Sequence, residues 1–291
     1  MDDFKRNGAE VVMADEEYTL FKDLVYREFG IVIRGDKRLT LQTKLACRLS
    51  LLGLSTYGDY YDRIVNEPSR EELCIFISHI TNNETYFLRE SSQLNAFAKL
   101  LADIKKQKKS LNTVSILSAG CSSGEEVYTL NIMLMESGLF AWGWQVRLIG
   151  MDVSRTALEK AKKAVYSKKS FRMMNGSEDF VQKYFDKSDE RYILKKYFQS
   201  NVQFIHGNVL LPESLYGIND IDVIFCRNIL IYMDDAAVGR IAANFYRHLS
   251  DDGYLFVGLS ESLLKRTDLF VPEYRDGIIV YRKNPSAYSR T

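Results

Sequence analysis

Two adjacent acids, Glu125 and Glu126, follow a turn of small residues in the stretch ILSAGCSSGEEVYTL, which runs from Ile116 to Leu130. The apolar start of this stretch predicts a strand, and the spacing of apolar residues after Gly124 predicts a helix. A strand that turns into a helix through small residues is typical of a nucleotide-binding loop. A pyrophosphate, however, needs the free N–H groups at the helix start, and two carboxylates would repel it. They would attract a cationic ligand instead.

An aspartate, Asp152, ends the next strand-like run, Val146 to Met151. An acid here suits a ribose diol, because its two oxygens accept both hydroxyl protons. S-adenosylmethionine has an adenosine and no phosphate, and Glu126 is a candidate to hold its ammonium group. Gly120 and Gly124 would let the backbone approach such a ligand. The two acids alone are explained equally well by the helix dipole, and Asp152 favours the cofactor.

Two more polar stretches follow predicted strands, namely His206 to Val209 and Cys226 to Tyr232. Polar residues at the carboxyl ends of parallel strands often line a ligand pocket. Asn208 suits the amine and ring nitrogen of adenine. Taken singly, Asn208 and Asn228 are explained more simply as turn residues.

The elements that position these residues fall into two regions. Up to about residue 80 the apolar spacing is helical and predicts helices at Tyr18–Phe29, Arg38–Leu52, Tyr57–Asn66 and Arg70–Ile80. After about residue 112, strand-like runs alternate with amphipathic helices, which predicts a doubly wound α/β fold with a parallel sheet. The predicted strands are Val114–Leu117, Val146–Met151, Val202–His206, Ile221–Cys226, Tyr254–Leu259 and Gly277–Arg282. The predicted helices include Glu125–Ser137, Ser154–Val165 and Ala236–Leu249.

One segment, from Phe180 to Phe204, breaks this alternation, because aromatic runs flank the polar turn Lys187–Arg191. This pattern predicts a small antiparallel insertion. We therefore expect a helical domain at residues 1–80 and an α/β domain at residues 81–291, with the insertion at about residues 171–204.

The bulk properties restrict the class of protein. The chain has 291 residues and a net charge of +1, so no global field draws it to nucleic acid or to an anionic membrane. Its four cysteines lack metal-ligand spacing, which suits a reducing compartment. Because of this cysteine spacing we expect no metal site. The sequence begins without the apolar segment of a signal peptide and has no membrane-length apolar run, so we expect a cytoplasmic protein.

Together, these residues resemble the chemotaxis receptor methyltransferases of the CheR type, which methylate glutamates of chemoreceptors with S-adenosylmethionine. The resemblance covers about Tyr18 to Tyr281. The motifs that carry it are ITNNETYFLRE at Ile80–Glu90, SAGCSSGEE at Ser118–Glu126, MDVS at Met151–Ser154, GNVL at Gly207–Leu210 and FCRNILIY at Phe225–Tyr232. The resemblance implies a small all-α domain, followed by a Rossmann-like class I methyltransferase domain with a small antiparallel β insertion. Leu88 and Val127 replace a usual phenylalanine and a common proline.

The resemblance also implies the roles of single residues. Glu126 matches the acid on the methionine amino group, and Asp152 matches the ribose acid. Arg89 and Tyr232 match the two residues that line the transfer site. The other implied cofactor contacts are Asn83, Thr85, Arg89 itself, Asn208, Val209, Asn228 and Ile229.

The expected chemistry needs no general base. A glutamate carboxylate is already ionised at neutral pH, since its reference pKa is about 4.3. We expect Arg89 and Tyr232 to hold it near the methyl group, and S-adenosylhomocysteine is then the product. The competing interpretations are a helix-surface cation for Arg89 and a core aromatic residue for Tyr232.

Receptor docking is expected at a basic stripe. Lys37, Lys44 and Arg48 fall on one face at and after the start of the predicted helix Arg38–Leu52. A stripe of this kind is usually a solvated face, but the matching helix of the family is implicated in docking. The expected partner is the cytoplasmic helical region of chemoreceptors. The hairpin turn is short and lacks glycine, whereas family members that tether to a C-terminal pentapeptide of the receptor look longer here. The resemblance therefore implies that this protein does not require such a tether, and we expect a monomer.

Two other classes of function stay open. One is a class I methyltransferase that acts on RNA or a small molecule, although the near-neutral charge argues against RNA. The other is a non-catalytic signalling module that binds S-adenosylmethionine or S-adenosylhomocysteine. The presence of both Arg89 and Tyr232 argues against such a module.

Overall fold

The chain divides into two compact units, Met1–Asn82 and Asn83–Thr291. The computed structural model describes residues 11–108, 112–171 and 178–290. Across these described ranges, no helix is both long enough and apolar enough to span a membrane.

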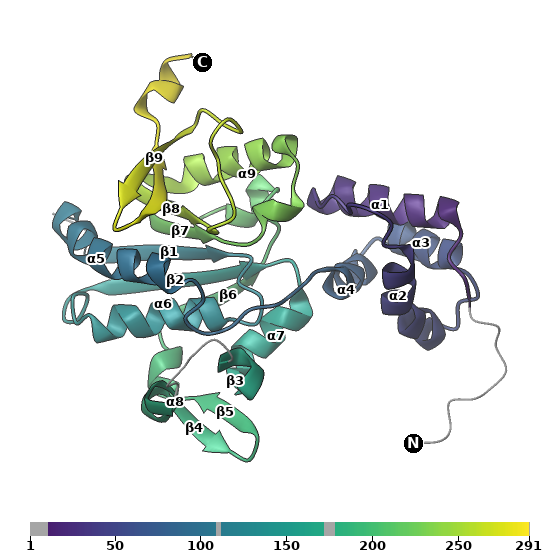
Figure 1. The fold of residues 1–291 in the computed structure, drawn as a ribbon, viewed down its shortest axis with the longest axis horizontal. Helices are drawn as coiled ribbons and strands as arrows, with labels where there is room; N and C mark the ends of the chain where they lie inside the picture. Colours follow the sequence, from purple (N-terminus) through teal and green to yellow (C-terminus); the bar gives the residue numbers. More distant parts are fainter. Residues whose placement is uncertain (1–10, 109–111, 172–177, 291) are drawn as a thin grey trace. The chain divides into compact units, whose positions relative to one another are not determined.

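The described part of the first unit is helical (Figure 1). Its helices are α1 (Asp15–Phe29), α2 (Arg38–Leu52), α3 (Tyr57–Asn66) and α4 (Glu71–Ile80). Phe21, Tyr60 and Phe76 are fully buried, and their rings contact one another in the core. Gly30 and Gly53 take left-handed backbone angles and end α1 and α2, as glycine commonly does at helix C-termini. The predicted all-α unit is confirmed.

The second unit is built on a mixed sheet with the strand order β6-β2-β1-β7-β8-β10-β9 among its described residues. Its strands are β1 (Thr113–Ala119), β2 (Gln145–Asp152), β6 (Val202–His206), β7 (Ile221–Cys226), β8 (Leu249–Val257), β9 (Phe270–Arg275) and β10 (Ile278–Lys283). The pairs from β6 through β8 are parallel, as predicted. Strand β10 is antiparallel to β8 and β9, which differs from the prediction. Asp276 and Gly277 both have positive φ, and this tight turn returns β10 directly along β9.

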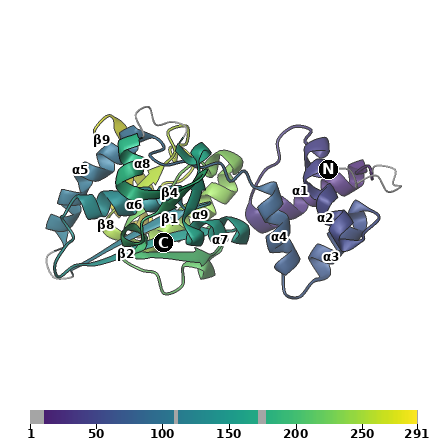
Figure 2. The same cartoon turned by 90° about the horizontal axis from the view of Figure 1, so that it is seen from below.

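Helices flank this sheet. They are α5 (Ser91–Gln107), α6 (Glu125–Glu136), α7 (Arg155–Lys163) and α9 (Asp235–His248). Figures 1 and 2 show α5 beside α6. The predicted helix Ser154–Val165 is shorter in the structure, because Ala164 takes a left-handed angle that ends α7.

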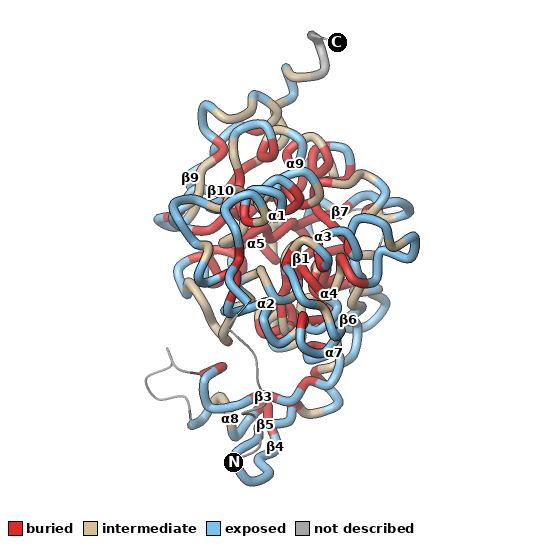
Figure 3. Tube along the Cα trace, turned by 90° about the vertical axis from the view of Figure 1, so that its right-hand side faces the viewer, coloured by how far each residue is buried: buried red, intermediate tan, exposed pale blue. Residues whose placement is uncertain are grey.

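Aromatic rings join the sheet to α5. Phe225 on β7 stacks on Phe256 of β8 at 4.5 Å between ring centroids, and Phe97 of α5 packs edge-on against Phe225 at 5.3 Å. Every residue of β7 is buried, and buried residues are drawn in red in Figure 3. A sheet covered in this way holds its carboxyl-end loops on a rigid base.

A second, antiparallel sheet lies in the chain between β2 and β6, and it confirms that a small antiparallel insertion is present, although its first strand precedes the predicted start at about residue 171. Its order is β3-β5-β4, with β3 (Val165–Ser167), β4 (Phe185–Ser188) and β5 (Arg191–Leu194). Helix α8 (Glu178–Tyr184) occupies the start of the segment predicted as a hairpin, so the hairpin itself is shorter than expected. Residues 172–177 of the predicted insertion lie outside the described residues.

Short 3₁₀ helices complete the described elements. They are Lys168–Phe171, Lys196–Gln199, Pro212–Leu215, Leu230–Tyr232 and Pro285–Arg290. The one at Leu230–Tyr232 follows β7 directly and belongs to the candidate site.

Candidate active site

The candidate site lies where four parallel strands end. Strand β1 is paired with β2 on one side and β7 on the other, and β6 lies beyond β2. The chain therefore changes direction across the sheet at β1, and ligands of doubly wound folds bind at such a switch point. The loop after β1, Asp152, Asn208 and Asn228 all follow or end these strands, so the topology brings them to one edge.

The loop after β1 is held against the end of β2. The N–H groups of Gly120 and Cys121 donate to the carbonyl oxygen of Met151 at 2.7 and 3.0 Å. Gly120 and Gly124 have φ values of 76° and 89°, which favour glycine. A Cβ atom on Gly120 would lie 2.1 Å from Cδ1 of Ile229, so the structure brings Ile229 onto this loop.

The two glycines are therefore explained by the protein itself. A Cβ atom on Gly124 would lie 2.9 Å from the Cβ of Ala161 in α7. A side chain of the protein fills the space beside each glycine, so packing alone requires glycine at both positions; that both also serve the approach of a ligand stays a prediction.

Asp152 is fixed by the backbone. Its two carboxylate oxygens accept hydrogen bonds from the N–H groups of Ser122 and Ser154, each at 2.8 Å. The residue is only 7% exposed. Burial raises the pKa of this carboxyl, and the backbone donors act against that rise. These backbone donors fix the orientation of the carboxylate at the end of β2.

The two acids at the start of α6 have different surroundings. Glu126 accepts a hydrogen bond from the Ser118 hydroxyl at 2.7 Å. Glu125 is only 3% exposed and accepts hydrogen bonds from Ser123 at 2.7 Å and Ser170 at 2.9 Å. Burial raises the pKa of Glu125. Glu125 thus ties the loop to the β insertion, which goes beyond favouring the helix dipole.

Arg227 is a site residue to which the sequence assigned no role. Its side chain is 2% exposed and directly follows the buried strand β7. Its Nη2 donates to the carbonyl oxygen of Arg89 at 2.7 Å, while Nη1 lies 3.4 Å from Glu126 and Nε lies 3.4 Å from Glu90. An arginine is almost never buried without partners, so its position at the end of an apolar strand was the available signal.

The predicted transfer residues, Arg89 and Tyr232, lie on two segments that this arginine connects. Arg89 precedes α5, donates to the carbonyl oxygen of Glu84 at 3.1 Å and lies over the ring of Tyr86. It is therefore not a helix-surface cation. Tyr232 ends the 3₁₀ helix after β7 and is 37% exposed, so it is not a core residue.

The other predicted cofactor residues lie in the same unit. The carbonyl oxygen of Asn83 accepts a hydrogen bond from Ser122 at 2.9 Å, which places Asn83 against the loop after β1. Thr85, which stands between Asn83 and Arg89 in the sequence, is half-buried. Asn228 has a φ of 61°, and its amide donates to Glu90 at 3.3 Å.

Asn208 and Val209 form the turn after β6. The Asn208 side-chain oxygen accepts a hydrogen bond from the N–H of Leu210 at 3.0 Å, which is typical of an asparagine that stabilises a turn. Val209 is buried, and its carbonyl oxygen accepts a hydrogen bond from Asn244.

The predicted docking residues lie in the first unit. Lys37 immediately precedes α2, and Lys44 donates to the carbonyl oxygen of Ile80 at 3.1 Å. Arg48 differs, because its Nε donates to the buried carboxylate of Glu72 at 2.8 Å. The charge of Arg48 is neutralised inside the unit, so the basic stripe is reduced to Lys37 and Lys44.

Comparison with known proteins identifies the family to which both units are similar. Residues 16–81 match the family model described as CheR methyltransferase, all-alpha domain, and residues 83–275 match CheR methyltransferase, SAM binding domain. Chemotaxis protein methyltransferase 2 of Vibrio cholerae is 31% identical over 94% of this chain and 95% of its own length. Chemotaxis protein methyltransferase of Borreliella burgdorferi is 31% identical over 87% of this chain and 89% of its own. The probable biofilm formation methyltransferase WspC of Pseudomonas putida is 34% identical over 78% of this chain and 52% of its own.

Proposed function

This chain belongs to the CheR methyltransferase family, and we propose that it transfers the methyl group of S-adenosylmethionine to glutamate carboxylates in the cytoplasmic helical region of chemoreceptors. The product on the receptor is a glutamyl methyl ester, and S-adenosylhomocysteine is released. The observation that carries the proposal is the edge of the sheet at which Asp152, Glu126 and the turn after β7 converge.

The charges at this edge fit the cofactor. Glu126 and Glu90 share the single buried guanidinium of Arg227, so the pair keeps an excess of negative charge. Such a cradle suits an ammonium and a sulfonium, whereas a phosphate would be repelled. We assign the ammonium to Glu126 and the ribose hydroxyls to Asp152. Asn83, Thr85, Arg89, Asn208, Val209, Asn228 and Ile229 are proposed to complete the cofactor site.

The residues of the chain act by orientation. When bound, S-adenosylmethionine supplies an electrophilic methyl group. We assign to Arg89 and Tyr232 the task of holding the substrate carboxylate in line with it, because correct alignment of two reactants can contribute several kcal/mol. No proton has to be removed, because a glutamate carboxylate is already ionised at neutral pH.

Docking is proposed at α2. Lys37 and Lys44 present positive charge that complements an acidic receptor helix. We propose that the enzyme acts as a cytoplasmic monomer and does not require a pentapeptide tether. A receptor of another chemosensory pathway is a second candidate substrate, since the Pseudomonas putida relative is named for biofilm formation.

Peptide mass spectrometry tests the proposal. The purified protein is incubated with S-adenosylmethionine and the cytoplasmic fragment of a chemoreceptor from the same organism. We expect receptor peptides to gain the mass of one methylene at glutamate residues, and glutamate-to-alanine substitution at those positions should abolish the gain. Methylation confined to lysine or arginine would refute the assignment.

A further inference from the structure

Glu261 lies in the loop after β8 and turns its carboxylate back onto the turn after β7. One carboxylate oxygen accepts the N–H groups of Gly258 at 2.6 Å and Asn228 at 2.8 Å. The other accepts the N–H of Ile231 at 3.0 Å. A single side chain therefore joins two loops at the carboxyl ends of neighbouring strands.

This carboxylate occupies the start of the 3₁₀ helix that ends at Tyr232. The first N–H groups of a helix have no carbonyl partner within it, and a side-chain acceptor can take their hydrogen bonds. Asn228, just before this helix, is held in the left-handed region with a φ of 61°. Such a backbone conformation persists only where its surroundings fix it, and Glu261 supplies that fixation.

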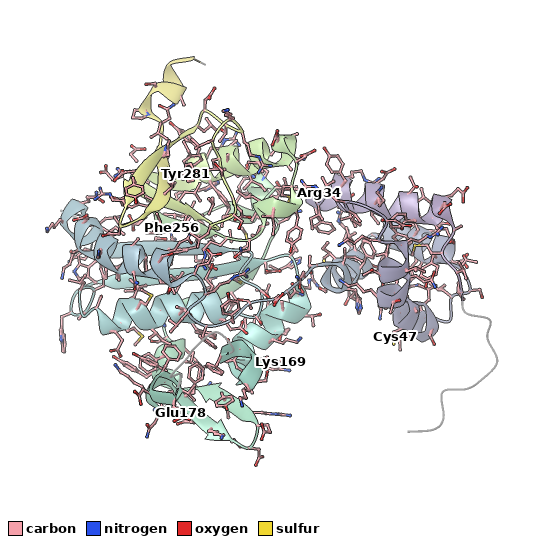
Figure 4. The ribbon with its side chains drawn as sticks, in the orientation of Figure 1. Arg34, Cys47, Lys169, Glu178, Phe256 and Tyr281 are labelled. Carbon is pink, nitrogen blue, oxygen red and sulfur yellow. The ribbon has the colours of Figure 1, made fainter. Side chains whose placement is uncertain are left out.

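The fit around Glu261 is close. A Cβ atom on Gly258 would lie 2.7 Å from the Glu261 carboxylate and 3.1 Å from the N–H nitrogen of Asn228, so a larger residue there would displace the acid. The loop is anchored at its other end by Tyr281 of β10, whose hydroxyl accepts the N–H of Leu263 at 3.1 Å. Tyr281 and Phe256 are labelled in Figure 4, on β10 and β8.

A second acid, Glu90, completes the connection. Its carboxylate accepts hydrogen bonds from the Asn228 amide and the Leu259 N–H, both at 3.3 Å. Glu90 directly follows Arg89 in the sequence, and Arg227 donates to the carbonyl oxygen of Arg89. Asn228 is thus held by two acids, one from the Arg89 segment and one from the loop after β8.

We propose that Glu261 is a positioning residue for methyl transfer, which fixes the turn from Asn228 to Tyr232 and so sets Tyr232 relative to Arg89. The proposal rests on the proposed function. A shift of about 1 Å in a reacting geometry can cost roughly 100-fold in rate, so an anchor at the base of a short turn has a large effect on turnover.

The test is a double-mutant cycle on the full-length protein with a chemoreceptor fragment. Glu261→Gln keeps the size of the side chain but leaves one acceptor oxygen for the backbone N–H groups that two oxygens accept in the wild type. We expect it to lower kcat by about 10- to 100-fold, with a smaller change in KM for S-adenosylmethionine. In a Tyr232→Phe background, Glu261→Gln should cost less than about 3-fold, because positioning is lost with the group that it positions. Glu190→Gln, in the exposed turn between β4 and β5, is the matched control and should keep wild-type turnover.

The outcomes separate the two proposals. Wild-type turnover in Glu261→Gln, a neutral Tyr232→Phe, or equal fold-losses in both backgrounds would overturn the positioning role while the proposed function stands. An inactive wild-type enzyme would overturn the proposed function and this role with it. If Glu261→Gln does not fold, as judged by circular dichroism, Gly258→Ala takes its place, since the added methyl group displaces the same carboxylate; its effect must also vanish in the Tyr232→Phe background.

Discussion

At the scale of single residues, the acids of the site differ in what surrounds them. Asp152 is oriented by two backbone N–H groups, Glu126 by Ser118 and Arg227, and Glu125 by two serine hydroxyls. Asp152 and Glu126 therefore suit a ligand, whereas Glu125 serves to join the loop to the β insertion. The role of Glu125 was left undecided by the sequence, because Ser170 approaches it only in the folded chain.

Asp152→Asn should weaken the binding of S-adenosylhomocysteine by about 10- to 100-fold, since a hydrogen bond to a charged group contributes about 1.5–3 kcal/mol. Isothermal titration calorimetry measures the affinity. Asp186→Asn removes an exposed carboxylate from β4 and is the control. Unchanged affinity in Asp152→Asn would contradict the ribose assignment.

The Asp152 carboxyl also predicts that cofactor affinity depends on pH. Burial raises the pKa of Asp152, so it takes up a proton at a higher pH than an exposed aspartate does. As the pH falls through this raised pKa, cofactor affinity should fall. The contribution of this group to folding stability should rise over the same range, because the folded state binds the proton more tightly than the unfolded state. Calorimetric titrations with S-adenosylhomocysteine at several pH values should show this fall in affinity for the wild type but not for Asp152→Asn. The same dependence of affinity on pH in both proteins would count against the prediction.

Arg89→Ala should lower turnover by about 10- to 100-fold, because the carboxylate loses a group that aligns it. Thermal unfolding should change little, since the contacts of the guanidinium are local: it donates to the Glu84 carbonyl oxygen and lies over Tyr86. Steady-state kinetics with a receptor fragment give the result. If the variant keeps both wild-type cofactor affinity and turnover, the role of Arg89 is refuted.

The sequence pointed to residues that end strands but not to those that fix them. Asp152 and Asn228 were found because each stands at the carboxyl end of an apolar run. Arg227, Glu90 and Glu261 were given no role, because their contacts join distant parts of the chain; the partner of Arg227 is 138 residues away. The local spacing of residue types does not indicate hydrogen bonds between distant parts of the chain.

At the scale of elements, α2 carries cations of two kinds. Arg48 pairs with the buried Glu72, which also accepts a hydrogen bond from Tyr60 at 2.8 Å. Lys44 is exposed and donates to the backbone carbonyl oxygen of Ile80. One stripe in the sequence thus divides into a structural cation and a candidate docking cation.

Lys44→Ala should raise the KM for receptor by about 2- to 5-fold without lowering stability, because an exposed charge contributes at most about 1 kcal/mol. Arg48→Ala should instead destabilise the protein by on the order of 3 kcal/mol, since it leaves a buried carboxylate unpaired. Kinetics and thermal unfolding of both variants, with Lys106→Ala on α5 as the exposed control, make the comparison. Added salt should weaken receptor methylation by wild type but less so by Lys44→Ala.

Most elements of the sheet were predictable, because buried parallel strands read as apolar runs, and β7 is buried at every position. Helix α5 was missed although Leu94, Phe97 and Leu101 lie on one buried face. Its start carries no capping side chain, and Glu90 enters it with a left-handed φ of 56°. The β insertion was predicted from its aromatic residues, yet α8 within it has the same aromatic character as the strands.

At the scale of the whole molecule, the chain divides at residues 82 and 83, and the two family models meet at the same place. Every proposed cofactor residue lies in the second unit, and the proposed docking lysines lie in the first. The two activities of binding the cofactor and docking on the receptor are thereby assigned to separate units.

The whole-molecule account predicts that a tether is not required. The turn between β4 and β5 consists of Asp189 and Glu190 and is short and without glycine. A receptor that lacks its C-terminal pentapeptide should be methylated at the same initial rate as the intact receptor. Tight binding of the isolated pentapeptide in a calorimetric titration would refute this prediction.

The central claim is methyl transfer from S-adenosylmethionine to glutamate carboxylates, and the chemical stability of the transferred methyl group tests it most directly. Chemoreceptor is incubated with the wild-type protein and S-adenosylmethionine that carries a labelled methyl group, and the labelled receptor is then exposed to mild base. Our account predicts that the receptor gains label and that base releases it as methanol, as a glutamyl methyl ester requires. Label that withstands base, or no label on the receptor from a folded enzyme, would contradict it.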